Sequence, residues 1–267
     1  TIIDKIYYLR WGQPGDNLYI LGGALPSATL GQGILVNNYS NIMEYPQVRQ
    51  IGLNLQAKLA GVGIELIHSN FKVASPGIIG LRGSYNIFGI SFVTDLDQNG
   101  GLKDGDGDSY PDYYDFYPDD FEKWDDENEA QDEWDSFNDF IENQGGEPLD
   151  NSLFNDWFED SQFYNDYNPD EAVRDPISGI AFDVEYPLSK KMILYSQIAQ
   201  LIGKIDTSLN HLELDETKLG WGSVPLGLKA KLGPVNLLAE YRMNSRRFIF
   251  NYWDKAYDVN RVTLNSS

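Results

Sequence analysis

The sequence predicts an all-β protein: an antiparallel sheet of roughly 12 strands, interrupted by a large acidic insert. Two observations lead to this fold class. Apolar and polar residues alternate along most of the chain outside residues 95–175, which is the period of a strand with one apolar face. Acidic residues concentrate within 95–175, where the alternation stops. We therefore expect residues 1–94 and 176–267 to build the sheet and 95–175 to form a separate insert.

The alternation is clearest in residues 51–59, where Leu53 and Leu55 fall on one face and Asn54 and Gln56 on the other. Similar patterns predict strands in residues 62–70, 77–88, 178–188, 226–232 and 235–244, and a less regular one in 191–203. Further strands are predicted at YYLRWG, at NLYILGGAL, at LGQGILVNN (30–38), at RRFIFNYW (246–253) and at DVNRVTL (258–264).

Two architectures are compatible with strands that have one apolar face. In a soluble β-sandwich that face packs on a second sheet, and in a transmembrane β-barrel it contacts lipid. No run of about 18 apolar residues predicts a transmembrane helix, but a transmembrane strand needs only about 9–11 residues. The long alternating strands, the 25 glycines and the polar faces with both charge signs favour the barrel.

Residues 1–94 and 176–267 resemble the outer-membrane β-barrel proteins of Gram-negative bacteria. The resemblance rests on the alternation, on short turns such as GQPGDN, and on aromatic residues near strand ends, including Trp11, Tyr85 and Trp221. It implies the lipid bilayer as a partner, an outer-membrane location and a porin-like channel or surface scaffold. Many such barrels end on an aromatic residue, whereas this chain ends TLNSS.

The charge distribution separates the insert from the rest of the chain. Residues 95–175 hold 28 acidic and three basic residues, whereas the remainder holds 13 acidic and 17 basic residues. The acidic surface argues against binding to nucleic acid. The chain has no cysteine, which excludes disulfides and thiolate metal sites, and no N-terminal signal peptide is visible.

The stretch DLDQNGGLKDGDGDSYPDYYD (95–115) predicts calcium binding. Calcium takes six to eight oxygen ligands, and a compact loop supplies them from carboxylates on alternate residues. Asp104, Asp106 and Asp108 stand at loop positions 1, 3 and 5, with Asp112 at 9 and Asp115 at 12. The predicted ligands also include the carbonyl of Tyr110 and an incomplete upstream loop of Asp95, Asp97 and Asn99.

The segment DGDGDSYPDYYDFYPDD within this stretch resembles a thrombospondin type 3 repeat. The resemblance covers residues 95–120 and implies short loops that wrap calcium ions with little regular structure. Ser109 departs from the glycine that the repeat carries there. The alternative interpretation is a solvated acidic loop without a metal ion.

The rest of the insert predicts two short acidic helices that pack on each other or on the barrel mouth. Phe121, Trp124, Trp134, Phe137 and Ile141 recur at near-helical spacing before Gly145-Gly146, which predicts a helix end. A second helix is predicted from Leu153 to Phe158, with Asn151 or Ser152 as its N-cap. We expect calcium to reduce the repulsion within this insert and the insert to face the extracellular side.

The sequence predicts no enzyme, because His68 has no Ser or Asp partner at a readable spacing. The charged residues on the polar strand faces either set the ion selectivity of a channel or fill the interior with ion pairs. These residues are Lys58, Glu65, Arg82, Asp183, Glu185, Lys229, Lys231, Glu240 and Arg242. Two alternatives to a porin-like channel or scaffold stay open. One is a secreted calcium-dependent adhesion module on a soluble β-sandwich, and the other is a subunit of a cell-surface assembly that docks a protein partner through the insert.

Overall fold

The computed structural model places the chain in two compact units, residues 1–101 with 174–267, and residues 102–173. It describes residues 7–43, 45–46, 48–73, 77–101, 110–112, 115–164, 176–203, 219–245 and 247–261. We refer to the units as the sheet unit and the insert unit, and describe each by itself.

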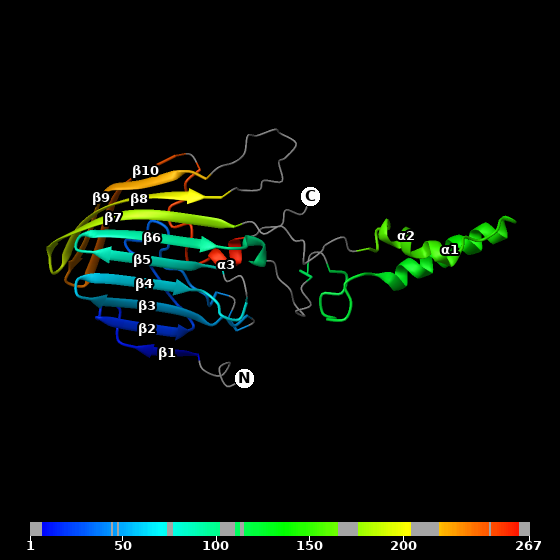
Figure 1. The fold of residues 1–267 in the computed structure, drawn as a ribbon, viewed down its shortest axis with the longest axis horizontal. Helices are drawn as coiled ribbons and strands as arrows, with labels where there is room; N and C mark the ends of the chain where they lie inside the picture. Colours follow the sequence, from blue (N-terminus) through cyan, green and yellow to red (C-terminus); the bar gives the residue numbers. More distant parts are fainter. Residues whose placement is uncertain are drawn as a thin grey trace. The chain divides into compact units, whose positions relative to one another are not determined.

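The sheet unit is one antiparallel sheet in which every strand pairs with its neighbours in sequence (Figure 1). This arrangement confirms the all-β prediction. Its strands are β1 (Tyr8–Trp11), β2 (Leu18–Gly23), β3 (Gly52–Leu59), β4 (Val62–His68), β5 (Ile79–Tyr85), β6 (Phe88–Asp95), β7 (Ile177–Ser189), β8 (Met192–Ile202), β9 (Trp221–Leu232) and β10 (Val235–Asn244).

The described residues form a 10-stranded sheet instead of the roughly 12 strands expected, and among them β1 and β10 do not pair with each other. Two predicted strands are wrong, because residues 30–38 and 247–253 form turns and loops. Of the predicted strand 258–264, residues 258–260 belong to the short helix α3 (Tyr257–Asn260), and 262–264 lie outside the described residues. A short apolar run does not distinguish a strand from a buried loop, and several side chains of these segments are buried in the core.

The connections between strands differ at the two edges of the sheet where the strands end. At one, which we call the short-turn edge, Ala60-Gly61, Asn86-Ile87, Lys190-Lys191 and Gly233-Pro234 each join two strands. Ala60, Gly61, Asn86 and Gly233 have positive φ, which is typical of the favoured two-residue hairpin turns. At the opposite, long-loop edge the longer connections between β2 and β3, β4 and β5, β6 and β7, and β8 and β9 begin and end, because alternate connections of an antiparallel meander start from one edge.

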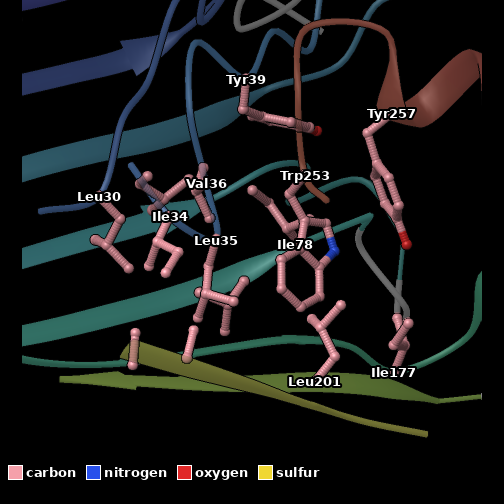
Figure 2. Close-up of a cluster of buried hydrophobic side chains, with 14 of the residues drawn as sticks. Leu30, Ile34, Leu35, Val36, Tyr39, Ile78, Ile177, Leu201, Trp253 and Tyr257 are labelled. Carbon is pink, nitrogen blue, oxygen red and sulfur yellow. The ribbon is translucent and has the colours of Figure 1, made fainter. Parts of the chain in front are cut away.

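The inner face of the sheet is covered by two segments from the long-loop edge. Residues 24–43, which we call the strap, follow β2, and residues 247–261, the C-terminal segment, follow β10. They hydrogen-bond to each other, from Trp253 N to Leu35 O at 3.1 Å and from Asn37 N to Trp253 O at 3.2 Å. Their apolar side chains form one buried core with Ile67 and Val93 of the strands. Ile177 and Leu201 belong to the same core (Figure 2).

The insert unit contains helices α1 (Glu127–Asn143) and α2 (Phe154–Glu159), so both predicted helices are present, but Phe121 and Trp124 lie in a turn and a bend before α1 and not in the helix as predicted. They pack on each other through Ala130, Trp134 and Phe154, with the Trp134 and Phe154 rings 5.8 Å apart. Gly145, with a φ of 81°, follows the C-cap of α1, as predicted. The predicted cap of the second helix is wrong, because Asp150 caps the short 3-10 helix η3 (Asn151–Leu153) that leads into α2.

Candidate functional site

A charged cluster lies on the inner face of the sheet, in the half near the short-turn edge, and Arg82 of β5 is at its centre. The Arg82 guanidinium is paired with Asp183 through two hydrogen bonds of 2.7 and 3.2 Å. It also donates to Glu65 at 2.8 Å and to Glu185 at 2.7 Å. Arg82 is 5% exposed, so this group of three carboxylates around one guanidinium is largely withdrawn from water.

Two glycines make room for the pairing of Arg82 with Asp183. β6 lies between β5 and β7, and a Cβ on Gly89 of β6 would come within 2.4 Å of Arg82 Nη2 and 2.6 Å of Asp183 Oδ2. Gly31 of the strap, with a φ of +57°, lies against the other side of the guanidinium, 2.7 Å from its Nε to an added Cβ. The arginine therefore reaches across a strand only because these positions have no side chain.

The tip of the strap is held to the sheet by the same cluster. Gly31 N donates to Glu65 Oε2 at 3.2 Å, and Lys229 Nζ of β9 donates to Gln32 O at 3.3 Å. The Lys229 ammonium also lies 5.2 Å from the centre of the Tyr195 ring, a favourable cation–π position. These contacts hold the tip of the strap to β4 on one side and to β9 on the other.

The outer face of the same sheet is apolar and exposed. The outward side chains Ile90, Phe92, Ile180, Phe182 and Ile198 are 56%, 47%, 42%, 45% and 51% exposed. Leu81, Tyr85, Ile202, Trp221 and Leu226 extend the surface over β5, β8 and β9. Soluble proteins seldom expose apolar patches this extensive, and those that exist are usually covered by a partner or a membrane. We call this surface the outer apolar face.

A second buried polar network of the sheet unit joins the end of β6 to the strap and the C-terminal segment. Asp95, at the end of β6, is fully buried and accepts hydrogen bonds from Tyr257 at 2.8 Å and from Arg261 at 3.1 Å. Asp258 of α3 accepts from the Tyr39 hydroxyl of the strap at 2.6 Å. Burial raises the pKa of the Asp258 carboxyl, although the Tyr39 hydrogen bond and the Arg261 charge act in the opposite direction.

The predicted calcium ligands are distributed over both compact units. Asp95 and Asp97 belong to the sheet unit, and Asp97 N donates to Asp95 Oδ1 at 2.9 Å. In the insert unit, the Tyr110 ring stacks on Trp124, and Asp115 is buried and accepts from Tyr117 N at 2.8 Å. Asp112 is half-buried. The side chains of Asp104, Asp106, Asp108 and Asn99 lie outside the described residues.

Among the residues that the structure describes, no group of three or more His, Asp or Glu side chains is placed to hold a metal ion. Within the same residues, no helix is long and apolar enough to cross a membrane. Calcium binding therefore stays a prediction from the spacing of residues 95–115.

Sequence reasoning found the members of the Arg82 cluster but did not predict their pairing or the role of the strap. The signal that was available is glycine within a strand, which often marks a close approach of another chain segment. Gly89 in β6 marks the close approach of the Arg82–Asp183 pair. Gly179 in β7 marks the close approach of Leu35 and Trp253.

Comparison with known proteins adds no relative to these observations: no protein-family model, curated protein or solved structure matches the chain.

Proposed function

We propose that this protein is a membrane-embedded β-sheet protein of the outer-membrane barrel type that acts as a surface scaffold for its acidic insert. The outer apolar face is the observation that carries the proposal. A sheet in lipid places apolar side chains outward, and the outward side chains of β5 to β9 in the sheet unit are apolar and exposed. Backbone groups in lipid need partners, so the proposal requires the edges of β1 and β10 to be paired in the membrane.

The interior of the sheet unit favours a surface scaffold and argues against an open channel. Half of the inner face is covered by the strap and the C-terminal segment, whose core includes Leu35, Val36 and Trp253, none more than 2% exposed. The other half holds the Arg82 cluster, in which one guanidinium is paired with three carboxylates. A porin-like channel needs a continuous water-filled lumen, and the packed strap and C-terminal segment oppose one in the half of the interior that they fill.

The proposal places the insert at the long-loop edge, outside the membrane, with calcium bound by residues 95–115. Residues 115–164 carry exposed acidic side chains on both sides of α1, and their repulsion opposes folding of the helical pair. Calcium bound by the adjoining carboxylates would lower this repulsion. The insert is then the part that meets other molecules at the cell surface, and the sheet anchors it.

A pair of matched substitutions tests what covers the outer apolar face. Ile198 on β8 is 51% exposed and Leu153 in the insert unit is 47% exposed. In lipid, Ile198→Arg lowers the free energy of unfolding by about 2–4 kcal/mol near the bilayer midplane. On a surface facing water, such a change stays within about 0.5 kcal/mol, which is the expectation for Leu153→Arg. Equal, small effects of both substitutions on urea unfolding in lipid vesicles would contradict the proposal.

Fractionation provides an independent test of membrane residence. We expect the chain to sediment with outer membranes and to migrate differently on a denaturing gel before and after heating. A monodisperse folded protein without detergent argues for the soluble adhesion module, and co-purification in a stoichiometric complex without lipid argues for a subunit of an assembly. Either result overturns membrane insertion.

The calcium-dependent part of the proposal has its own matched variants. Asp106→Ala with Asp108→Ala should raise protease cleavage within 95–175 as much as a chelator does and should abolish any further effect of chelator. Asp132→Ala with Asp139→Ala removes the same charge from the exposed surface of α1 and should preserve the calcium response. A double variant at 106 and 108 that responds to calcium like the wild type would show that the acidic run is a solvated linker.

A further inference from the structure

The half of the interior near the short-turn edge contains a cavity of about 540 Å³, between the strap tip and strands β3, β4 and β5. Its size falls within the range of small-molecule binding sites, roughly 300–1,000 Å³. Water reaches it, because the side chains of Glu65 and Glu185 are 21% and 30% exposed. The polar and charged side chains that line it include Gln56, Lys58, Glu65, Arg82, Ser84 and Glu185.

The arginine at the base of this cavity has little capacity to bind an anion. Four hydrogen bonds already join Arg82 to Asp183, Glu65 and Glu185, and a guanidinium has five N–H groups. The Gly31 backbone also packs directly against it. Arg82 therefore neutralises carboxylates of the protein and offers no free fork to a carboxylate or phosphate ligand.

The carboxylates, in contrast, exceed the buried cations of the cluster. Asp183, Glu65 and Glu185 all pair with Arg82, while the nearby Lys229 donates to Gln32 O. Within the described part of the chain, Oε2 of Glu185 receives no hydrogen bond that the structure assigns, whereas Oε1 accepts from Arg82. Glu185 thus offers an accessible anionic oxygen inside a cavity where water screens charge less than at the surface.

Lys58 is the remaining cation on the cavity wall, and its position differs from that of the carboxylates. It is exposed on β3, one residue before the strand ends, so solvent screens its charge. Glu65 and Glu185 belong to the Arg82 cluster and are held in place by hydrogen bonds from Arg82. Lys58 therefore opposes the negative charge of these carboxylates only weakly.

We propose that this cavity binds a small organic cation, an ammonium or guanidinium compound, with Glu185 as its principal anionic partner. Glu65 adds a second negative charge, and Gln56 and Ser84 provide neutral hydrogen-bonding groups on adjacent strands. Because the site lies on the inner face, the inference does not depend on whether the outer apolar face contacts lipid.

Calorimetry on the full chain, in whichever detergent or buffer keeps it monodisperse, tests this inference with three four-carbon probes: a diamine, a diol and a dicarboxylate. We expect the diamine alone to bind. Glu185→Gln should weaken the diamine by about tenfold or more, the typical effect of losing one charge-assisted hydrogen bond. Lys58→Gln should strengthen it, since that substitution removes the opposing charge.

Glu133→Gln serves as the matched control, because Glu133 lies exposed on α1 in the insert unit. It should leave the diamine affinity unchanged. Failure of the diamine to bind at millimolar concentration, or tighter binding of the dicarboxylate, overturns the inference. Equal losses with Glu185→Gln and Glu133→Gln also overturn it, since they would show unspecific attraction to the acidic chain. None of these results bears on membrane residence.

Discussion

Gly179 lies on the inner face of β7 directly beneath the strap and the C-terminal segment, so an added methyl group measures how tightly the interior is packed. An ideal Cβ at this position would lie 3.0 Å from Leu35 Cδ2 and 3.0 Å from Trp253 Cζ3. Both of those side chains are buried in the core, and each would have to shift to admit the methyl group. We therefore predict that Gly179→Ala destabilises the sheet unit.

The size of the effect follows from two opposing contributions. Overpacking a close-packed core costs about 1–3 kcal/mol. Replacing glycine by alanine within a strand contributes about 0.5–1 kcal/mol in the favourable direction. Gly83 on β5 is the matched control, because a Cβ there meets nothing within 4 Å and only the favourable contribution remains. The free energies of unfolding of the two variants should differ by about 1–3 kcal/mol.

Urea unfolding followed by tryptophan fluorescence measures this difference, and a second substitution tests its cause. Leu35→Ala alone costs about 2–5 kcal/mol, since it leaves a cavity. Combined with Gly179→Ala, it should cost less than the sum, because the new methyl group fills part of that cavity, with a coupling of about 0.5–3 kcal/mol. Equal stability of Gly179→Ala and Gly83→Ala, together with additive effects, would refute a packed interior.

Three further predictions concern other parts of the molecule. Arg82→Ala should cost about 3–5 kcal/mol in urea unfolding, because it leaves buried carboxylates without a partner; Lys123→Ala, at the exposed ion pair with Asp120, should cost at most about 1 kcal/mol, and similar losses would contradict the central role of the cluster. The hydrogen bond from the backbone N–H of Ser152 holds the pKa of Asp150 below its ordinary value. This cap therefore stabilises the start of η3 fully at a pH above the ordinary pKa of aspartate, and its contribution is lost as the pH falls through the lowered pKa. Asp150→Asn, which keeps the hydrogen-bond acceptor but does not titrate, should remove this contribution to the acid-induced loss of circular dichroism, and an unchanged acid transition would refute it. Replacing residues 102–173 by a short Gly/Ser linker should leave the sheet unit folded. Replacing residues 95–175 should destabilise the sheet unit, because it also removes the buried carboxylate of Asp95. Equal stability of the two deletion variants would show that this carboxylate contributes nothing.

The sequence predicted the parts of the fold that depend on local periodicity. The strands β3, β5 and β7 follow from alternating apolar residues, because side chains of a strand point to opposite faces. Helix α1 follows from the spacing of Trp134 and Ile141 and from the two glycines after it. The separation of the insert from the sheet follows from charge, since residues that repel one another do not join an apolar core.

The candidate site was predictable in composition but not in arrangement. Arg82, Asp183 and Glu185 were identified as inward-facing charges from alternation alone. Their pairing depends on Gly89, which permits contact across a strand, and on register, which a single sequence does not specify. The spacing of the carboxylates in residues 95–115 predicts calcium binding, yet the burial of Asp95 against Arg261 arises from the C-terminal segment, far away in the sequence.

The sequence by itself determined which residues alternate, where charge accumulates and which segments are apolar. Only the tertiary structure decided what covers each apolar surface. Ile34, Leu35 and Val36 form an apolar run of the kind that predicts a strand, yet they belong to the strap and fill the interior. Burial of apolar side chains stabilises a loop and a strand alike. The strands' own outward side chains remain exposed, since no other part of the described chain packs against them. Hydrophobic burial has no direction, so the partner of an apolar residue is set by the three-dimensional arrangement of the chain.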